Sequence, residues 1–209
     1  MTLLRKAEHR ALSRITLSGK VLDLGGDARS SYALTLAAEA RVVTVNISTA
    51  TGADIVANLE EPLPIPNDSY DHVLLMNVLE HVFEYRLLLD ECARVLRPGG
   101  SIVIIVPYLF PYHASPSDFH RYSAEALNRA LSSAGFTTVE IEPLGSGVFS
   151  ARWLMLERLL PGRVQDFIAP GTHALASLAD AVFTSLAHTL RKKYNPADYA
   201  LGFCAVAKL

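Results

Sequence analysis

The alternation of strand-like and helical segments is the feature that most constrains how this chain can fold. Short β-rich runs recur along its 209 residues and are separated by segments of helical periodicity. The strand-like runs are 21–24, 41–45, 54–57, 70–76, 101–106, 136–141 and 200–207. Strands that alternate with helices form a mostly parallel sheet with helices on both faces. The chain therefore predicts a seven-stranded, doubly wound α/β sheet, with ligands bound beyond the carboxyl ends of the strands.

One domain is expected, and its helical segments mark four parts along the chain. Helices are expected within 3–15, 30–40, 84–96, 124–134, 149–160 and 172–192. We place a leading helix in 1–17, a ligand-binding core in 18–145, a helical insertion in 146–195 and the closing strand in 196–209. The insertion is expected to form a helical cap before the last strand.

Composition excludes several classes of protein. The formal net charge is −2 and no basic stripe exists, which argues against a nucleic-acid partner. The two cysteines, Cys92 and Cys204, lie in apolar runs, and no segment has the length of a signal peptide or a membrane span. A reduced, cytoplasmic chain is expected. The mean hydropathy of +0.24 indicates more apolar residues than a core alone accounts for. The excess is expected to form an oligomer interface, a deep pocket or a membrane-surface contact.

The first strand ends in an acid and a glycine turn, Asp23-Leu24-Gly25-Gly26. The G-x-G-x-x-G spacing that cradles a dinucleotide pyrophosphate is absent, which argues against a nicotinamide-dependent enzyme. An acid before a glycine turn suits a ligand that offers an ammonium group and a ribose.

Several segments together resemble the class I S-adenosylmethionine-dependent methyltransferases, particularly the type 11 group. The resemblance covers roughly residues 20–145, and its most specific pieces are Asn77-Val78-Leu79-Glu80-His81-Val82 and Arg94-Val95-Leu96-Arg97-Pro98-Gly99-Gly100. It implies a Rossmann-like fold and S-adenosylmethionine as cofactor, with S-adenosylhomocysteine as product. By position, it implies cofactor contacts from Asp23, Gly25, Gly26, Asn46, Ile47, Asn58, Leu59 and Asn77.

Three positions depart from the family pattern. Asp27 stands where the family usually has glycine, and Asn46 and Asn58 stand where it usually has acids. Because a neutral hydrogen bond is weaker than a charge-assisted one, each asparagine is expected to cost cofactor binding ~1 kcal/mol. These departures support an alternative in which the protein is a catalytically silent methyltransferase-like binding or assembly module.

The segment 107–123 is rich in titratable side chains and follows the fifth strand, on the ligand-binding edge. We expect His113 or His120 to act as a general base, with His81 nearby, and Tyr112, Asp118 and Arg121 to contact the substrate. The alternative is an ordered loop in which Asp118 pairs with Arg121 and Ser123 caps the next helix. A metal bound by His113, Asp118 and His120 is a weaker interpretation, because their spacing matches no compact zinc motif.

The second helix of the insertion carries an apolar stripe of Leu175, Leu178, Ala179, Val182, Leu186 and Leu190, followed by Arg191-Lys192-Lys193. We expect this stripe to pack on the core or to form a substrate lid. A homodimer face and a peripheral membrane contact are the alternatives. Taken together, the sequence predicts methyl transfer to a small-molecule or glycan-like acceptor, preferably at oxygen.

Overall fold

The computed structural model describes residues 2–26, 39–157 and 159–209. The described residues form a seven-stranded sheet in the order β3-β2-β1-β4-β5-β7-β6. Its strands are β1 (Lys20–Leu24), β2 (Arg41–Asn46), β3 (Ile55–Val56), β4 (Tyr70–Met76), β5 (Leu96–Pro107), β6 (Thr137–Leu144) and β7 (Gly202–Lys208). β7 runs antiparallel to both of its neighbours, whereas the pairs among β1 to β5 are parallel. The predicted fold class is thus confirmed, while the helix expected at 30–40 lies almost wholly outside the described residues.

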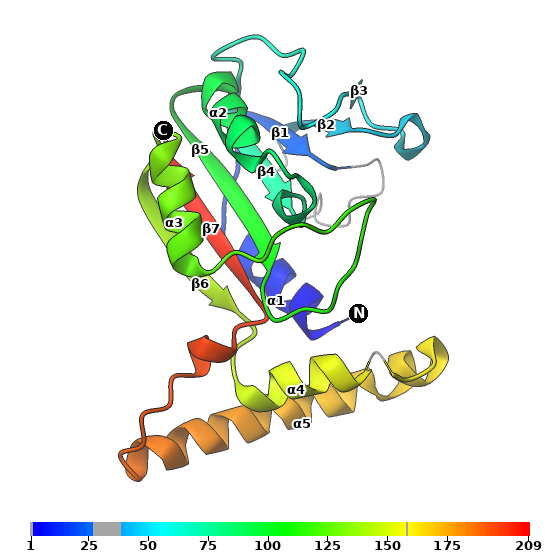
Figure 1. The fold of residues 1–209 in the computed structure, drawn as a ribbon, viewed down its shortest axis with the longest axis vertical. Helices are drawn as coiled ribbons and strands as arrows, with labels where there is room; N and C mark the ends of the chain where they lie inside the picture. The colour runs from blue at the N-terminus through cyan, green and yellow to red at the C-terminus, as the bar shows by residue number, and fades with distance from the viewer. Residues whose placement is uncertain (1, 27–38, 158) are drawn as a thin grey trace.

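Helices cover both faces of the sheet (Figure 1). The described α-helices are α1 (Leu3–Leu12), α2 (Tyr85–Val95), α3 (Ala124–Ser133), α4 (Val148–Glu157) and α5 (Gly162–Thr189). Short 3₁₀ turns occur at η2 (Thr49–Thr51), η3 (Leu79–His81) and η4 (Pro196–Tyr199). Hydroxyl caps set two of the helix starts: the Oγ of Thr2 accepts from the N–H of Arg5, and that of Ser123 from the N–H of Ala126.

The alternating side chains of the strands divide the core into two clusters. Leu22 and Ile104 belong to the cluster covered by α2 and α3, whereas Val21 and Val103 belong to the cluster covered by α1 and α4. β5 is buried on both faces, with every side chain from Ile102 to Val106 at 0% exposure. This rigid centre fixes the carboxyl ends of β1, β4 and β5, where the candidate site lies.

Three boundaries differ from the sequence prediction. β5 begins at Leu96 rather than at 101, because Leu96 pairs with Tyr70 before a register shift. β6 continues to Leu144 because β7 pairs with it along that length. α5 begins at Gly162, ten residues before the expected start, and runs through Pro170. A proline removes one helical hydrogen bond, and here the buried side chains on either side of it, Ala169 and His173, hold the helix together.

The insertion between β6 and β7 forms a hairpin of α4 and α5 that lies beyond α1, at the end of the molecule where β5 terminates (Figure 1). None of the described helices is long and apolar enough to cross a membrane. Both cysteines, Cys92 and Cys204, are free and buried.

Candidate functional site

The turn after β1 requires its two glycines. Gly25 has a φ of +84°, and a Cβ there would lie 2.3 Å from Cγ2 of Val78. A Cβ on Gly26 would lie 2.0 Å from Oδ2 of Asp23, whose side chain is 1% exposed. The backbone therefore turns directly over the buried Asp23 carboxylate, and any larger side chain would displace it. Asp27, which stands where the family usually has glycine, lies outside the described residues.

Asn46, at the end of β2, holds this turn in place. Its Nδ2 donates to the carbonyl oxygens of Gly25 and Gly26, at 3.1 Å each. Its Oδ1 accepts from the N–H of Ser48 at 3.2 Å. An aspartate could not make the first two contacts, because a carboxylate is an acceptor only. The amide at this position is therefore suited to the protein's own turn.

The other residues expected near the cofactor lie at the ends of β2 and β3. Ile47 is 60% exposed, whereas Leu59 is buried. Oδ1 of Asn58 accepts from the N–H of Glu60, and its Nδ2 donates to Oε1 of Glu61 at 3.0 Å. Asn58 thus stabilises the turn that follows β3.

Asn77, directly after β4, is bound by the first helix. It has a φ of +53°, and its Nδ2 donates to Oε1 of Glu8 on α1 at 3.0 Å. Glu8 is 2% exposed, and burial raises the pKa of its carboxyl group while the Asn77 and Arg5 contacts lower it. The helix α1 therefore forms one wall of the site.

A pocket of about 420 Å³ opens between α1, η3 and the segment after β5. Its size is in the usual range for small-molecule sites. It is lined by Thr2, Leu4, Arg5, Glu8, Asn77, His81, Pro107, Phe110 and His113. Two of the three histidines proposed to be catalytic, His81 and His113, therefore face one cavity at the carboxyl edge of the sheet.

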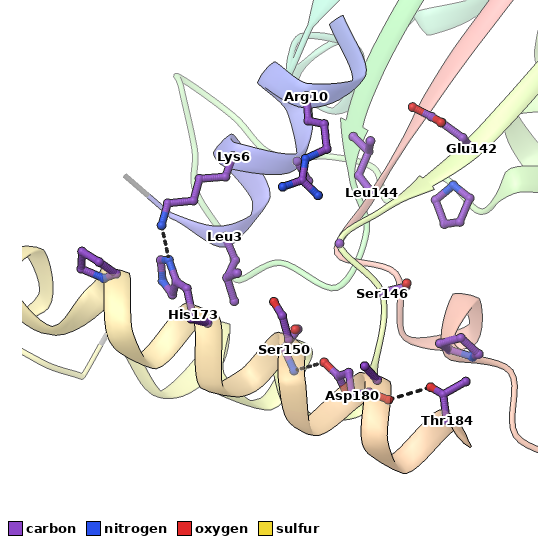
Figure 2. A pocket seen from close by; sticks show the side chains of 18 of the residues that line it. Leu3, Lys6, Arg10, Glu142, Leu144, Ser146, Ser150, His173, Asp180 and Thr184 are labelled. Atoms are coloured by element: carbon purple, nitrogen blue, oxygen red, sulfur yellow. Dashed lines mark hydrogen bonds between the residues drawn. The ribbon is translucent and has the colours of Figure 1, made fainter. Parts of the chain in front are cut away.

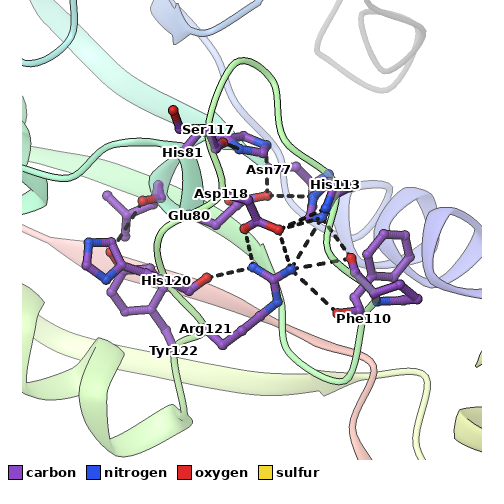
Figure 3. A network of polar contacts seen from close by, with 12 residues as sticks. Asn77, Glu80, His81, Phe110, His113, Ser117, Asp118, His120, Arg121 and Tyr122 are labelled. Carbon is purple, nitrogen blue, oxygen red and sulfur yellow. Dashed lines mark hydrogen bonds and ion pairs between the residues drawn. The ribbon is translucent and has the colours of Figure 1, made fainter.

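The residues 107–123, here named the rim loop, hold His113 in a dense polar network (Figure 3). Nδ1 of His113 lies 3.1 Å from the carbonyl oxygen of Pro111 and 3.3 Å from Oδ2 of Asp118. Its Nε2 lies 3.6 Å from Oε1 of Glu80, whose side chain is fully buried. Nη2 of Arg121 also lies 3.4 Å from Nδ1, at a longer distance than the two acceptors. The two acceptors favour the tautomer with the proton on Nδ1, which leaves Nε2 as the acceptor.

The surrounding carboxylates set the charge of this histidine. Contact with Glu80 raises the pKa of His113 above its usual range, aided by the Pro111 carbonyl and by Asp118, although burial opposes them. The Arg121 guanidinium holds the pKa of Asp118 far below its usual range. Asp118 therefore stays ionised and orients His113, and an imidazolium formed there is stabilised by two carboxylates.

Glu80 is the functional candidate that the sequence analysis missed. Neither of its carboxylate oxygens has a hydrogen-bond partner within the described part of the chain, and the imidazoles of His81 and His113 lie beside Oε1, at 3.7 and 3.6 Å. The only sequence signal was its position in Leu79-Glu80-His81, and nothing in that motif shows which way the carboxylate points.

The same three side chains are the described group whose candidate ligand atoms lie within 4.8 Å of one another. The alternative metal set of His113, Asp118 and His120 is not brought together: His113 and Asp118 are in contact, but His120 lies among the rings of Phe83, Tyr85 and Tyr122. Nδ1 of His81 contacts the carbonyl oxygen of Ser117.

The remaining predicted residues lie apart from the pocket. His120 packs among the rings of Phe83, Tyr85 and Tyr122, with Nε2 at 3.3 Å from the carbonyl oxygen of Phe83. Tyr112 is 74% exposed. Arg121 is engaged by Asp118 and by backbone carbonyls, and Ser123 caps α3. Asp118 thus pairs with Arg121 and Ser123 caps α3, as the ordered-loop interpretation predicts. Both terminal nitrogens of Arg121 already contact Asp118 or backbone carbonyls, which argues against a substrate role for this side chain.

Known structures share this fold. A SAM-dependent methyltransferase from Archaeoglobus fulgidus matches with a TM-score of 0.61, covering 98% of this chain and 94% of its own at 18% identity. An S-adenosylmethionine-dependent methyltransferase from Mesorhizobium loti matches with a TM-score of 0.61, covering 97% and 98% at 18% identity. The fold is that of the class I S-adenosylmethionine-dependent methyltransferases.

Sequence comparison matches part of the chain to a methyltransferase family. Residues 22–104 match the family model described as a methyltransferase domain, of type 11. A probable S-adenosylmethionine-dependent methyltransferase of Mycolicibacterium smegmatis is 34% identical over 85 residues, which are 38% of this chain and 33% of that protein. A demethylmenaquinone methyltransferase of Clavibacter sepedonicus is 29% identical over 188 residues, covering 70% and 76%. Residues 22–104 of this chain are thus similar to the type 11 S-adenosylmethionine-dependent methyltransferase domain. The chain spans about a third of the length of the first curated relatives that it matches.

Proposed function

We propose that the protein transfers a methyl group from S-adenosylmethionine to a hydroxyl group of a small-molecule or glycan-like acceptor. The observation that carries this proposal is His113, whose Nε2 borders a pocket while its Nδ1 is held by Pro111 and Asp118. A base is useful only when the acceptor must lose a proton, as a hydroxyl group must.

The residues at the ends of β1 and β2 fit the methyl donor. Asp23 supplies a buried carboxylate beneath the Gly25–Gly26 turn, which suits the cationic methionine ammonium. Ile47 presents an exposed apolar side chain directly after Asn46, which suits packing against a flat base. When bound, the donor supplies an activated methyl group on its sulfonium.

The chain's own residues then have to align the acceptor and take its proton. Nε2 of His113 accepts the hydroxyl proton, and Glu80 and Asp118 stabilise the resulting imidazolium. Phe110, Pro107 and Leu4 give the pocket an apolar wall that limits water near the acceptor. Arg5 and Asn77 provide polar groups on the opposite wall, next to Glu8.

The names of two relatives support oxygen as the acceptor atom. Ubiquinone biosynthesis O-methyltransferases of Chelativorans and Parvibaculum are 27% and 34% identical to this chain over 117 and 71 residues. Together with the demethylmenaquinone enzyme they act on quinone-type compounds, so a ring-sized acceptor with a hydroxyl group is a reasonable class for the 420 Å³ pocket.

The test is a methyl-transfer assay with labelled S-adenosylmethionine and a panel of catechols, hydroquinones and sugar nucleotides. Wild-type protein is expected to label an acceptor at oxygen, and His113→Gln to lower kcat by 10²–10⁴-fold with donor affinity unchanged. Tyr112→Phe is the control, because that side chain is exposed outside the network. Donor binding without any transfer, across the panel and in His113→Gln alike, would favour the silent-module alternative.

A further inference from the structure

The outer face of α5 is apolar and uncovered. Five large side chains along it are at least half exposed: Phe167 at 88%, Leu175 at 66%, Leu178 at 61%, Val182 at 59% and Leu186 at 52%. Their spacing places them on one side of a helix. We name these five residues the outer stripe. The expectation that this stripe packs on the core is therefore wrong.

The opposite face of α5 is fixed by buried polar contacts, which explains why the stripe points outward (Figure 2). Both carboxylate oxygens of Asp180 accept from the N–H groups of Phe149 and Ser150 at the start of α4, at 2.8 Å each. A Cβ on Gly147 would lie 2.1 Å from Cγ of Asp180, so the chain is built around this carboxylate.

A second polar link joins α5 to α1 across a groove of about 790 Å³. Nε2 of His173 contacts Oε2 of Glu157 on α4 at 2.7 Å, and its Nδ1 accepts from Nζ of Lys6 at 3.0 Å. Because Asp180 and His173 must face inward to be satisfied, α5 cannot turn its apolar stripe toward the core. The contacts of the inner face therefore fix the outer stripe in its exposed position.

The exposed charges of the hairpin have one sign. Arg152, Arg163, Arg191, Lys192 and Lys193 are exposed, whereas the acids Glu157 and Asp180 are buried and bonded. This holds for the side chains that the structure describes, which do not include those of Arg158 and Asp166. Stripe-to-stripe pairing of two copies would bring cations near cations in either orientation, because Arg163 and Arg191 lie at the two ends of α5.

We propose that the α4–α5 hairpin binds the surface of an anionic lipid bilayer, with the outer stripe inserted among the acyl chains and Arg191, Lys192 and Lys193 on the headgroups. An apolar helix face flanked by cations has the composition of an interfacial helix. The hairpin lies at the end of the molecule where β5 terminates (Figure 1). Pro107, which lines the pocket, is the last residue of β5, so docking would bring the pocket near the bilayer. This proposal does not depend on methyl transfer.

The test is flotation of the full chain with vesicles of phosphatidylcholine alone and with about one third phosphatidylglycerol. Wild-type protein is expected to float with the anionic vesicles and to be released by salt. Leu175→Gln/Leu178→Gln/Val182→Gln is expected to stay in the soluble fraction. The matched control, Ala174→Gln/Ser177→Gln/Ala181→Gln, changes three exposed positions on the groove side of the same helix and is expected to float like wild type.

A charge variant measures the electrostatic part. Arg191→Gln/Lys192→Gln/Lys193→Gln is expected to weaken partitioning to anionic vesicles about a hundredfold, or about fivefold per cation. Wild-type protein that does not float with anionic vesicles would overturn the proposal. A stripe-dependent dimer in light scattering, with no vesicle binding, would assign the stripe to a second copy instead. Circular dichroism melting of each variant shows that the fold is retained.

Discussion

The substitution Asn46→Asp separates the structural account from the family pattern, because the two predict opposite results. The family pattern has an acid at this position, so restoring it would tighten donor binding by about fivefold to tenfold through charge-assisted hydrogen bonds. In this structure the amide instead donates to the carbonyl oxygens of Gly25 and Gly26, at 3.1 Å each. Two neutral hydrogen bonds contribute about 2 kcal/mol, and a carboxylate would also repel both carbonyls.

We therefore expect Asn46→Asp to lower the melting temperature by about 4–8 °C for a chain of this size, and to weaken donor binding because the glycine turn is released. Thermal unfolding by circular dichroism and calorimetric titration with S-adenosylhomocysteine measure the two effects. Asn58→Asp is the matched control, because within the described residues its Nδ2 donates to the side chain of Glu61 and to no backbone carbonyl of the glycine turn. Tighter donor binding by Asn46→Asp at unchanged stability would refute this reasoning.

Three further predictions follow from the network and the hairpin. Asp180→Ala removes two hydrogen bonds from a buried carboxylate and is expected to lower stability by about 3 kcal/mol, which a melting curve within about one degree of wild type would contradict. Methyl transfer should rise with pH through the pKa of His113, which Glu80 and Asp118 raise above its usual value, since only the neutral imidazole accepts a proton. Glu80→Gln should move that midpoint of the pH–kcat profile to lower pH. An unchanged midpoint would show that Glu80 does not raise the pKa of His113. Treatment with EDTA should leave the rate unchanged, whereas loss of activity that zinc restores would assign Glu80, His81 and His113 to an ion.

The sheet was predictable because strand patterning and turn chemistry are local. The buried runs in β1 and β5, bounded by glycine turns and loops, define strands with little help from the rest of the chain. The insertion was harder. Pro170 and Gly171 signal a break, yet α5 continues through them because Ala169 and His173 are buried on the inner side. Such tertiary support leaves no trace in a helical pattern.

The candidate site was predictable in its residues but less so in their contacts. The segment 107–123 was singled out for its titratable side chains, and His113 does border a pocket with His81. The sequence could not show that Glu8 would cover Asn77 or that Glu80 would face two imidazoles, since both contacts join distant segments. Likewise, the stripe of α5 predicted a buried face, and only the inward position of Asp180 and His173 reverses it.

The central claim is that this domain binds the methyl donor at the turn after β1. Calorimetric titration of the purified protein with S-adenosylmethionine and S-adenosylhomocysteine, repeated on Asp23→Ala, tests it most directly. We expect wild type to bind both ligands with micromolar affinity, and Asp23→Ala to lose this binding while it remains folded by circular dichroism. Absence of binding by wild type at millimolar ligand, or equal binding by Asp23→Ala, would contradict it.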